Sequence, residues 1–233
     1  MPAIARVYRS IAASLIAAAF ALAAGCGLPQ FILLEPPISI SIDELVASVT
    51  FLSNPENDPD SFLGYELYYK FYAPATLDAQ FAADLSAISG AVAGSMPGVV
   101  TQRGFRRVIG AGQGGGPPLI PIAPTDRGTS FPVRILIDNS VAELSDGIAT
   151  WDPPSGPPLT VTLQRNLIAP KPFRPDAYVT SGPDRDADIP AGDYVGELAL
   201  ALVIVSYGVD FTTFQPLYSQ PVMTDRRLRL VIE

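Results

Sequence analysis

The sequence predicts a mainly β fold, an antiparallel β-sandwich with one short amphipathic helix. Alternating or β-branched stretches recur along the chain, and 24 prolines and 19 glycines divide it into brief elements. Only one stretch has persuasive helical periodicity, and no repeated strand–helix–strand pattern indicates a doubly wound sheet. The 48% hydrophobic content permits one sizeable core or two smaller ones.

Three strands are expected in the first third of the chain. Isoleucine alternates with serine over 38–42, and 45–51 is β-branched and apolar before a turn cluster at 54–60. The strand 64–72 is strongly aromatic. Its alternation places Tyr65, Leu67 and Tyr69 on one face and Glu66, Tyr68 and Lys70 on the other.

A helix is predicted over 77–88. Leu77, Phe81, Leu85 and Ile88 recur at steps of four, four and three, with Thr76 as a candidate N-cap and Gly90 just beyond the end. We expect this helix to pack across the end or edge of a sheet.

The later strands are expected at 99–109, 131–138, 147–151, 159–165, 194–207 and 226–232. Proline and glycine make loops of 110–118 and 170–190. Both faces of 194–207 are apolar, which predicts a central strand covered on each side. In the last strand, Leu228, Leu230 and Ile232 are expected to point inward.

The N-terminus has the organisation of a secretory signal. Arg6 and Arg9 precede an apolar stretch, 11–24, which is too short to span a bilayer as a mature helix. Residues 22–26 resemble the lipobox of bacterial lipoproteins, in the looser arrangement of spirochaete-type lipoboxes. The resemblance implies cleavage between Gly25 and Cys26, a diacylglyceryl group on the Cys26 thiol and acylation of the new α-amine. Several acyl chains on one residue give stable membrane attachment.

Two alternatives to this anchor stay open: an ordinary secretory signal cut nearby, or an uncleaved transmembrane anchor. The lipobox is favoured because Cys26 is the only cysteine and stands where a lipobox needs it. The expected location is the bacterial cell envelope. No aspartate follows Cys26 directly, which favours the outer over the inner membrane.

The expected domains are a signal peptide over 1–25, a lipidated tether over 26–37 and a sandwich region over 38–233. The last is either one body or two lobes, 38–125 and 126–233.

Parts of the sandwich region resemble fibronectin type III modules. Residues 49–70 and 149–159 each resemble the B strand, proline turn and C strand of such a module, and 198–207 with 218–222 resemble the F and G strands. The resemblance implies a sandwich. Phe51 stands where tryptophan is usual, and the predicted helix has no place in a standard module.

Composition narrows the function classes. The absence of histidine removes Ser-His-Asp and Cys-His nucleophiles and nearly every zinc, copper or haem site, so we expect neither an enzyme nor a bound cofactor. The net charge of −8 would repel nucleic acid. Two small arginine groups are more simply the solvated faces of strands: Arg103, Arg106 and Arg107, and Arg226, Arg227 and Arg229.

Four candidate ligand sites have simpler structural explanations. Gly110, Gly112 and Gly115 have dinucleotide-fingerprint spacing, but prolines follow where a helix should begin. Asp184, Asp186 and Asp188 open like a calcium loop that lacks its glycine and bidentate glutamate; Asn57, Asp58 and Asp60 form a weaker cluster. Tyr65, Tyr68, Tyr69, Phe71 and Tyr72 could form a ligand platform, although core packing explains them more simply.

The leading hypothesis is therefore a lipid-anchored envelope protein with a non-catalytic structural or interaction module. One alternative is a carbohydrate-active enzyme that uses paired carboxylates. Another is a solute-binding or lipid-binding subunit of an envelope transport system.

Overall fold

The computed structural model describes residues 32–44, 46–72, 77–114, 116–137, 146–168, 170–173 and 196–232. The signal segment, Cys26, Thr76 and the acidic loop around Asp184 lie outside these residues. The body that begins at Ile32 forms one compact unit.

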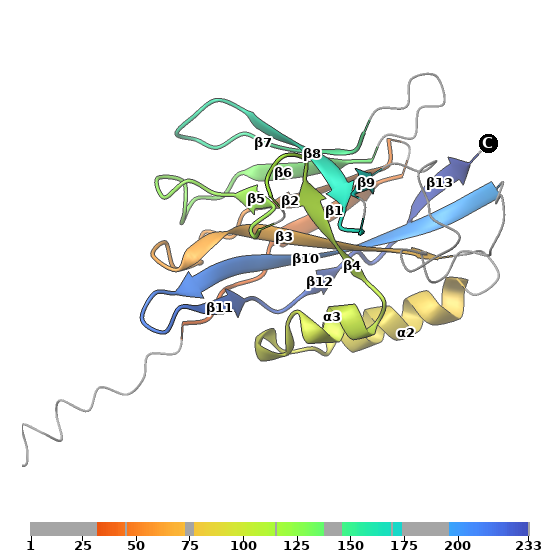
Figure 1. The fold of residues 1–233 in the computed structure, drawn as a ribbon, viewed down its shortest axis with the longest axis horizontal. Coiled ribbons are helices and arrows are strands. Elements are labelled where there is room, and N and C mark those ends of the chain that lie inside the picture. The colour runs from red at the N-terminus through yellow and green to blue at the C-terminus, as the bar shows by residue number, and fades with distance from the viewer. Residues whose placement is uncertain are drawn as a thin grey trace, which may run out of the picture. The chain divides into compact units, whose positions relative to one another are not determined.

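The described strands join in one antiparallel sheet (Figure 1), which confirms the mainly β fold. The principal order is β1-β2-β6-β7-β8-β4-β3-β10-β11, with β5 on β3, β9 on β8, and β12 and β13 on β10. The bounds are β1 Ile38–Asp43, β2 Ser48–Leu52, β3 Phe62–Tyr72, β4 Arg106–Gly110, β5 Ile120–Pro121, β6 Pro132–Leu136, β7 Ile148–Trp151, β8 Leu159–Arg165, β9 Lys171–Pro172, β10 Gly196–Asp210, β11 Gln215–Tyr218, β12 Val222–Met223 and β13 Leu228–Ile232.

The sheet curls around an inner core. β2 and β3 are far apart in the strand order, yet the rings of Phe51 and Tyr65 meet edge to face with centroids 5.0 Å apart. Apolar side chains from both halves of the sheet fill the space between them. The inner core includes Val49, Phe51, Tyr65, Leu67, Val133, Ile135, Trp151, Leu163, Leu202 and Ile204. Closure of the sheet over this cluster removes its apolar face from water.

An outer core covers the opposite face of β3 and β10. Two helices, α2 (Leu77–Ser89) and α3 (Gly98–Gln102), lie against this face, with the 3-10 turn η1 (Ala93–Ser95) between them along the chain (Figure 1). The outer core consists of Tyr68, Tyr72, Phe81, Ile88, Met96, Val100, Phe105, Ala199, Ala201, Val203, Val205 and Met223. β10 thus belongs to both cores, which confirms the prediction of a central strand covered on each side.

The predicted helix is confirmed, but its expected position is wrong. α2 packs on the face of the sheet through Phe81 and Ile88, because the outer side of β3 and β10 is itself apolar and must be covered.

The predicted strand 99–109 is wrong in its first half. Gly98 to Gln102 form a single helical turn, and Gly104 follows with a φ of +84° before β4 begins at Arg106. Val100 favoured a strand because its side chain is β-branched. In the structure it lies on α3 and packs in the outer core.

The N-terminal segment 32–37 packs against the body. Leu34 is buried and forms a parallel bridge with Ser219. Asn57 holds Glu35 from both sides: it accepts from the Glu35 N–H at 2.8 Å and donates to the Glu35 carbonyl at 3.1 Å. The Ser206 hydroxyl also donates to that carbonyl, at 2.6 Å. The last part of the predicted tether is therefore integrated into the fold.

The two stretches that resemble type III modules have different pairings. In the first, β2 and β3 are not neighbours in the sheet: β2 pairs with β1 and β6, and β3 with β4, β5 and β10. In the second, β7 and β8 form a hairpin in which Trp151 pairs with Leu159. Both halves of the chain contribute strands to the same described sheet.

Candidate functional site

The most concentrated buried polar chemistry in the described chain lies on β3, on the side that faces the helices. Glu66, Tyr68, Lys70 and Tyr72 alternate along the strand and so share one face. We call these four residues the polar row. Opposite them on β10 stand Val205, Val203, Ala201 and Ala199. These β10 side chains are small or apolar and offer no polar partner, so the row bonds within itself, to β4 and to the covering helices.

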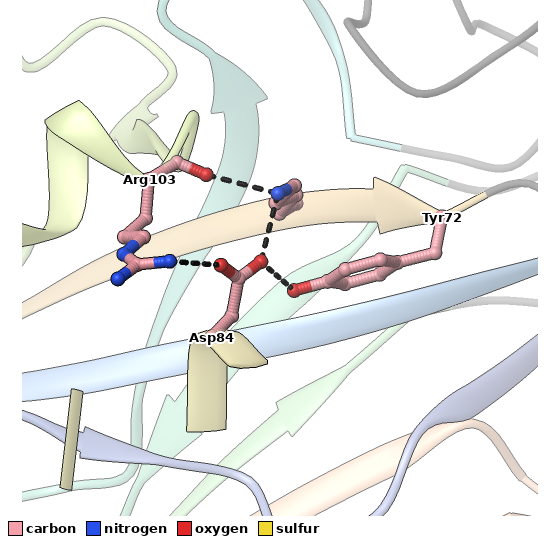
Figure 2. Close-up of polar contacts among 4 residues, drawn as sticks. Tyr72, Asp84 and Arg103 are labelled. Atoms are coloured by element: carbon pink, nitrogen blue, oxygen red, sulfur yellow. Dashed lines mark hydrogen bonds and ion pairs between the residues drawn. The ribbon is translucent and has the colours of Figure 1, made fainter. Parts of the chain in front are cut away.

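One end of the polar row binds Asp84 of α2. Lys70 Nζ lies 2.7 Å from Asp84 Oδ2, and the Tyr72 hydroxyl donates to the same oxygen at 2.8 Å. Figure 2 shows Asp84 between Tyr72 and Arg103, whose Nη1 lies 3.8 Å from Asp84 Oδ1. Lys70 also donates to the Arg103 carbonyl at 2.9 Å, at the end of α3. A single carboxylate thus links β3 to both helices.

Aromatic rings surround the Lys70 ammonium. It lies 5.0 Å from the Tyr72 ring centroid and 5.9 Å from that of Phe105. These contacts add cation–π attraction to the ion pair.

The other end of the row pairs Glu66 with Tyr68 and Arg107. The Tyr68 hydroxyl donates to Glu66 Oε2 at 2.6 Å, and Arg107 Nε lies 3.4 Å from Glu66 Oε1. Burial raises the pKa of Glu66 above its usual value, against the opposing effects of the Tyr68 hydrogen bond and the Arg107 charge. Burial, followed by the Glu66 charge, also raises the pKa of Tyr68.

Two more tyrosines adjoin Glu66. Tyr207 and Tyr218 are cross-strand partners whose rings meet edge to face at 5.5 Å. Burial first, and the Glu66 charge second, raise the pKa of Tyr218 to about 12. At neutral pH all three phenols keep their protons, and the Tyr68 hydroxyl donates its proton to Glu66.

A third buried carboxylate lies away from the polar row. Asp126 accepts hydrogen bonds from the Ser155 N–H at 2.9 Å and from the Ser155 hydroxyl at 2.6 Å. It ties the turn between β7 and β8 to the loop that precedes β6. Glu66, Asp84 and Asp126 each therefore bond to a different element of the fold.

The aromatic group predicted on β3 is buried throughout. Tyr65, Tyr69 and Phe71 pack in the inner core, and Tyr68 and Tyr72 pack in the outer core. This confirms the core-packing interpretation and excludes the group as an open ligand platform, because each face of β3 is covered.

The arginines of the first group are not simply a solvated strand face. Arg107 is partly buried against Glu66, and Arg103 lies at the end of α3 beside Asp84. Arg103 departs from the predicted strand because it caps the C-terminal end of α3.

The glycine loop and the weaker acidic cluster have local structural roles. Gly110 ends β4, and Gly112 follows in a turn with a φ of +75°; Gly115 lies outside the described residues. Asn57 binds the backbone of Glu35, while Asp58 accepts from the Ser61 hydroxyl at 2.8 Å. Within the described residues, no group of three or more His, Cys, Asp or Glu side chains has the arrangement of a metal site.

Sequence reasoning missed Asp84 altogether, and it missed the roles of Arg107 as the partner of Glu66 and of Asn57 as the partner of the Glu35 backbone. A signal for Asp84 was present: it stands three residues after Phe81 and four before Ile88, on the apolar stripe of α2. A carboxylate at such a position needs a buried partner. Nothing local identifies that partner as Lys70.

Comparison with protein-family models, curated proteins and solved structures finds no match to this chain. Of the helices in the described part, none has the length and apolar character to cross a bilayer.

Proposed function

We propose that the chain is a cell-envelope lipoprotein, anchored through acyl groups on Cys26, whose β body is a non-catalytic structural or interaction module. The anchor rests on the lipobox-like residues that end at Gly25 and Cys26. An outer-membrane location agrees best with the residues that follow the cysteine.

One observation supports a non-catalytic body: the buried carboxylates serve as braces. Asp84 joins β3 to the helices, Glu66 joins β3 to β4, and Asp126 joins two loops. A general acid or base must present its proton to a substrate, whereas these groups are held by neighbouring protein groups. Their geometry supports rigidity of the body.

Metabolic labelling with a radioactive fatty acid tests the anchor. In a bacterium that processes lipoproteins, the wild-type chain should incorporate label and Cys26→Ala should not. Mass spectrometry should place the mature N-terminus at an acylated Cys26. Label retained by Cys26→Ala, or an unmodified N-terminus, would overturn the anchor.

A glycoside panel tests the non-catalytic assignment. The purified chain should not hydrolyse chromogenic glycosides above the rate of a buffer blank. Hydrolysis that disappears in Glu66→Gln or Asp84→Asn would establish the carboxylate enzyme instead.

A further inference from the structure

Two large aromatic side chains project from the hairpin that joins β10 to β11. Phe211 is 55% exposed and Phe214 is 76% exposed, both in the turn between Asp210 and Gln215. Figure 1 shows this hairpin at one end of the sheet. Aromatic side chains usually bury their surface, so two at one tip mark a contact site.

The tip is firmly built. Asp210 accepts hydrogen bonds from the Thr212 N–H at 2.8 Å and from the hydroxyls of Thr212 and Thr213 at 2.6 and 2.7 Å. The Phe214 N–H donates to the Asp210 carbonyl at 2.6 Å. These bonds satisfy the polar groups of the turn and hold its backbone.

Phe214 has a φ of +57°, a conformation that favours glycine or asparagine. A bulky side chain there strains the backbone by about 1 kcal/mol or more. Glycine would form this turn with less strain, so turn formation does not explain the aromatic ring at this position.

The first described residues lie alongside the strand that starts at this tip. The bridge between Leu34 and Ser219 is parallel, so residues 32 and 33 lie on the Gln215 side of that bridge. Leu34 also packs against the tip strand: a Cβ on Gly208 would lie 3.1 Å from Leu34 Cδ1. Leu33, next to it, is 68% exposed.

The chain length fixes how far a lipid on Cys26 can be from this end. Fully extended, the chain from Cys26 to Leu34 spans at most about 28 Å. Back along β11, Gln215 lies about 13 Å from Ser219. An anchor at Cys26 therefore lies within reach of the hairpin tip and allows the tip to touch the bilayer surface.

We propose that Phe211 and Phe214, together with Leu33, insert into the lipid interface and orient the body against the membrane. This inference rests on the proposed lipid anchor. Amphipathic segments insert apolar side chains about 5–10 Å into the boundary between headgroups and acyl chains. The only charge on the tip, Asp210–Gln215, is the acid Asp210, so apolar burial and not attraction to anionic lipid drives the contact.

Tryptophan quenching tests this insertion in the full lipidated protein. Phe214→Trp is reconstituted in phosphatidylcholine vesicles with or without bromine on the upper acyl chains. Trp151, the only native tryptophan, is buried in the inner core and supplies the constant background. We expect brominated lipid to remove about half of the added emission, because bromine then lies at the depth of an interfacial aromatic ring.

Ile168→Trp is the matched control. Ile168 is 79% exposed and follows β8, near Asn166, whose N–H donates to the Arg107 carbonyl. Arg107 pairs with Tyr68 of β3. The part of β3 near the tip is Phe62, which pairs with Gly208 and lies six residues before Tyr68. The control side chain is equally accessible but far from the tip, and its emission should not respond to bromine. Phe211→Trp, whose backbone is unstrained, repeats the test if Phe214→Trp folds poorly.

The outcomes separate this inference from the proposed function. Wild-type protein that does not float with vesicles overturns both the anchor and the insertion. If the protein floats but brominated lipid quenches tryptophan at 214 and 211 no more than tryptophan at 168, the insertion alone is overturned. If the emission shifts with protein concentration and not with lipid, the tip contacts a second copy of the chain. That outcome also overturns the insertion.

Discussion

The strongest single-residue constraint in the described body is Asp84. Its carboxylate is 6% exposed and accepts from Lys70 and Tyr72, which lie on another element. A buried charge is tolerated only when neighbouring groups compensate for its lost hydration. Asp84 therefore fixes how α2 sits on β3 as well as contributing to stability.

Asp84→Ala should lower the free energy of unfolding by about 3 kcal/mol, because it removes the buried carboxylate that pairs with the partly buried Lys70 ammonium. Asp78→Ala is the matched control on the same helix: Asp78 is 89% exposed and pairs with Arg227 at the surface. The control should change stability by less than about 0.5 kcal/mol. Denaturant titration measures both, and equal effects would show that Asp84 is not a special brace.

Glu66 predicts a pH dependence of stability. Burial raises its pKa above 4.5, so the folded chain holds this proton more tightly than the unfolded chain does. The resulting stabilisation is fully present below pH 4.5 and is lost as the pH rises through the folded-state pKa. Glu66→Gln keeps the hydrogen bond from Tyr68 and carries no charge. Its free energy of unfolding, relative to wild type, should therefore increase between pH 4.5 and neutral pH.

Denaturant titrations at a series of pH values check this difference. Glu56→Gln, the same substitution at an exposed glutamate, provides the control. A difference for Glu66→Gln that stays flat or falls would mean that the Arg107 charge outweighs burial.

At the scale of elements, the N-terminal segment is held by side chains of the loop between β2 and β3. Asn54 donates to the Pro36 carbonyl at 2.8 Å, and Asn57 binds both backbone groups of Glu35. Both asparagines are buried. They satisfy backbone groups that the sheet does not pair, and so convert a predicted tether into part of the body.

Asn57→Ala should release this segment locally. We expect the Glu35 amide to exchange its hydrogen about tenfold faster, because loss of one buried hydrogen-bond partner weakens the local structure by about 1–2 kcal/mol. Amides of β3 and β10 should keep their protection. Hydrogen-exchange mass spectrometry measures both regions, with exposed Thr101→Ala as control. Unchanged exchange at Glu35 would show that Leu34 packing alone holds the segment.

At the scale of the whole molecule, β3 and β10 couple two cores. Leu202 and Ile204 point into the inner core, whereas Val203 and Val205 point into the outer core. Neither layer can separate without exposing one face of the same two strands. We therefore expect the helix layer and the curled sheet to unfold together.

Two probes report on the two layers: Trp151 fluorescence on the inner core and helical circular dichroism on α2 and α3. Their denaturant midpoints should coincide in the wild-type chain. Leu202→Ala should lower the free energy of unfolding by about 2–5 kcal/mol, and Val203→Ala by about 2 kcal/mol. Both probes should shift equally in each variant. If Val203→Ala shifts the denaturant midpoint of the circular-dichroism signal but not that of Trp151 fluorescence, the outer layer unfolds independently.

The sequence by itself determined the mainly β class, the helix at 77–88, the facing of β3 and the central position of β10. These features follow from local periodicity, since the spacing of apolar residues alone decides which face of a strand or helix avoids water. The same reasoning failed at 99–109. Pro97 caps a helical turn over 98–102 and Gly104 adopts a positive φ, so the strand begins only at Arg106 although valines precede it.

Only the tertiary structure decided which distant residues meet. The curl that brings Phe51 to Tyr65, the pairing of Lys70 with Asp84, and the docking of Leu34 beside the β10–β11 hairpin each join different elements of the fold. The stability of such contacts depends on the burial that the complete fold creates, so no local pattern encodes the partner. For the same reason, the common end shared by the exposed phenylalanines and the docked N-terminal segment became visible only in three dimensions.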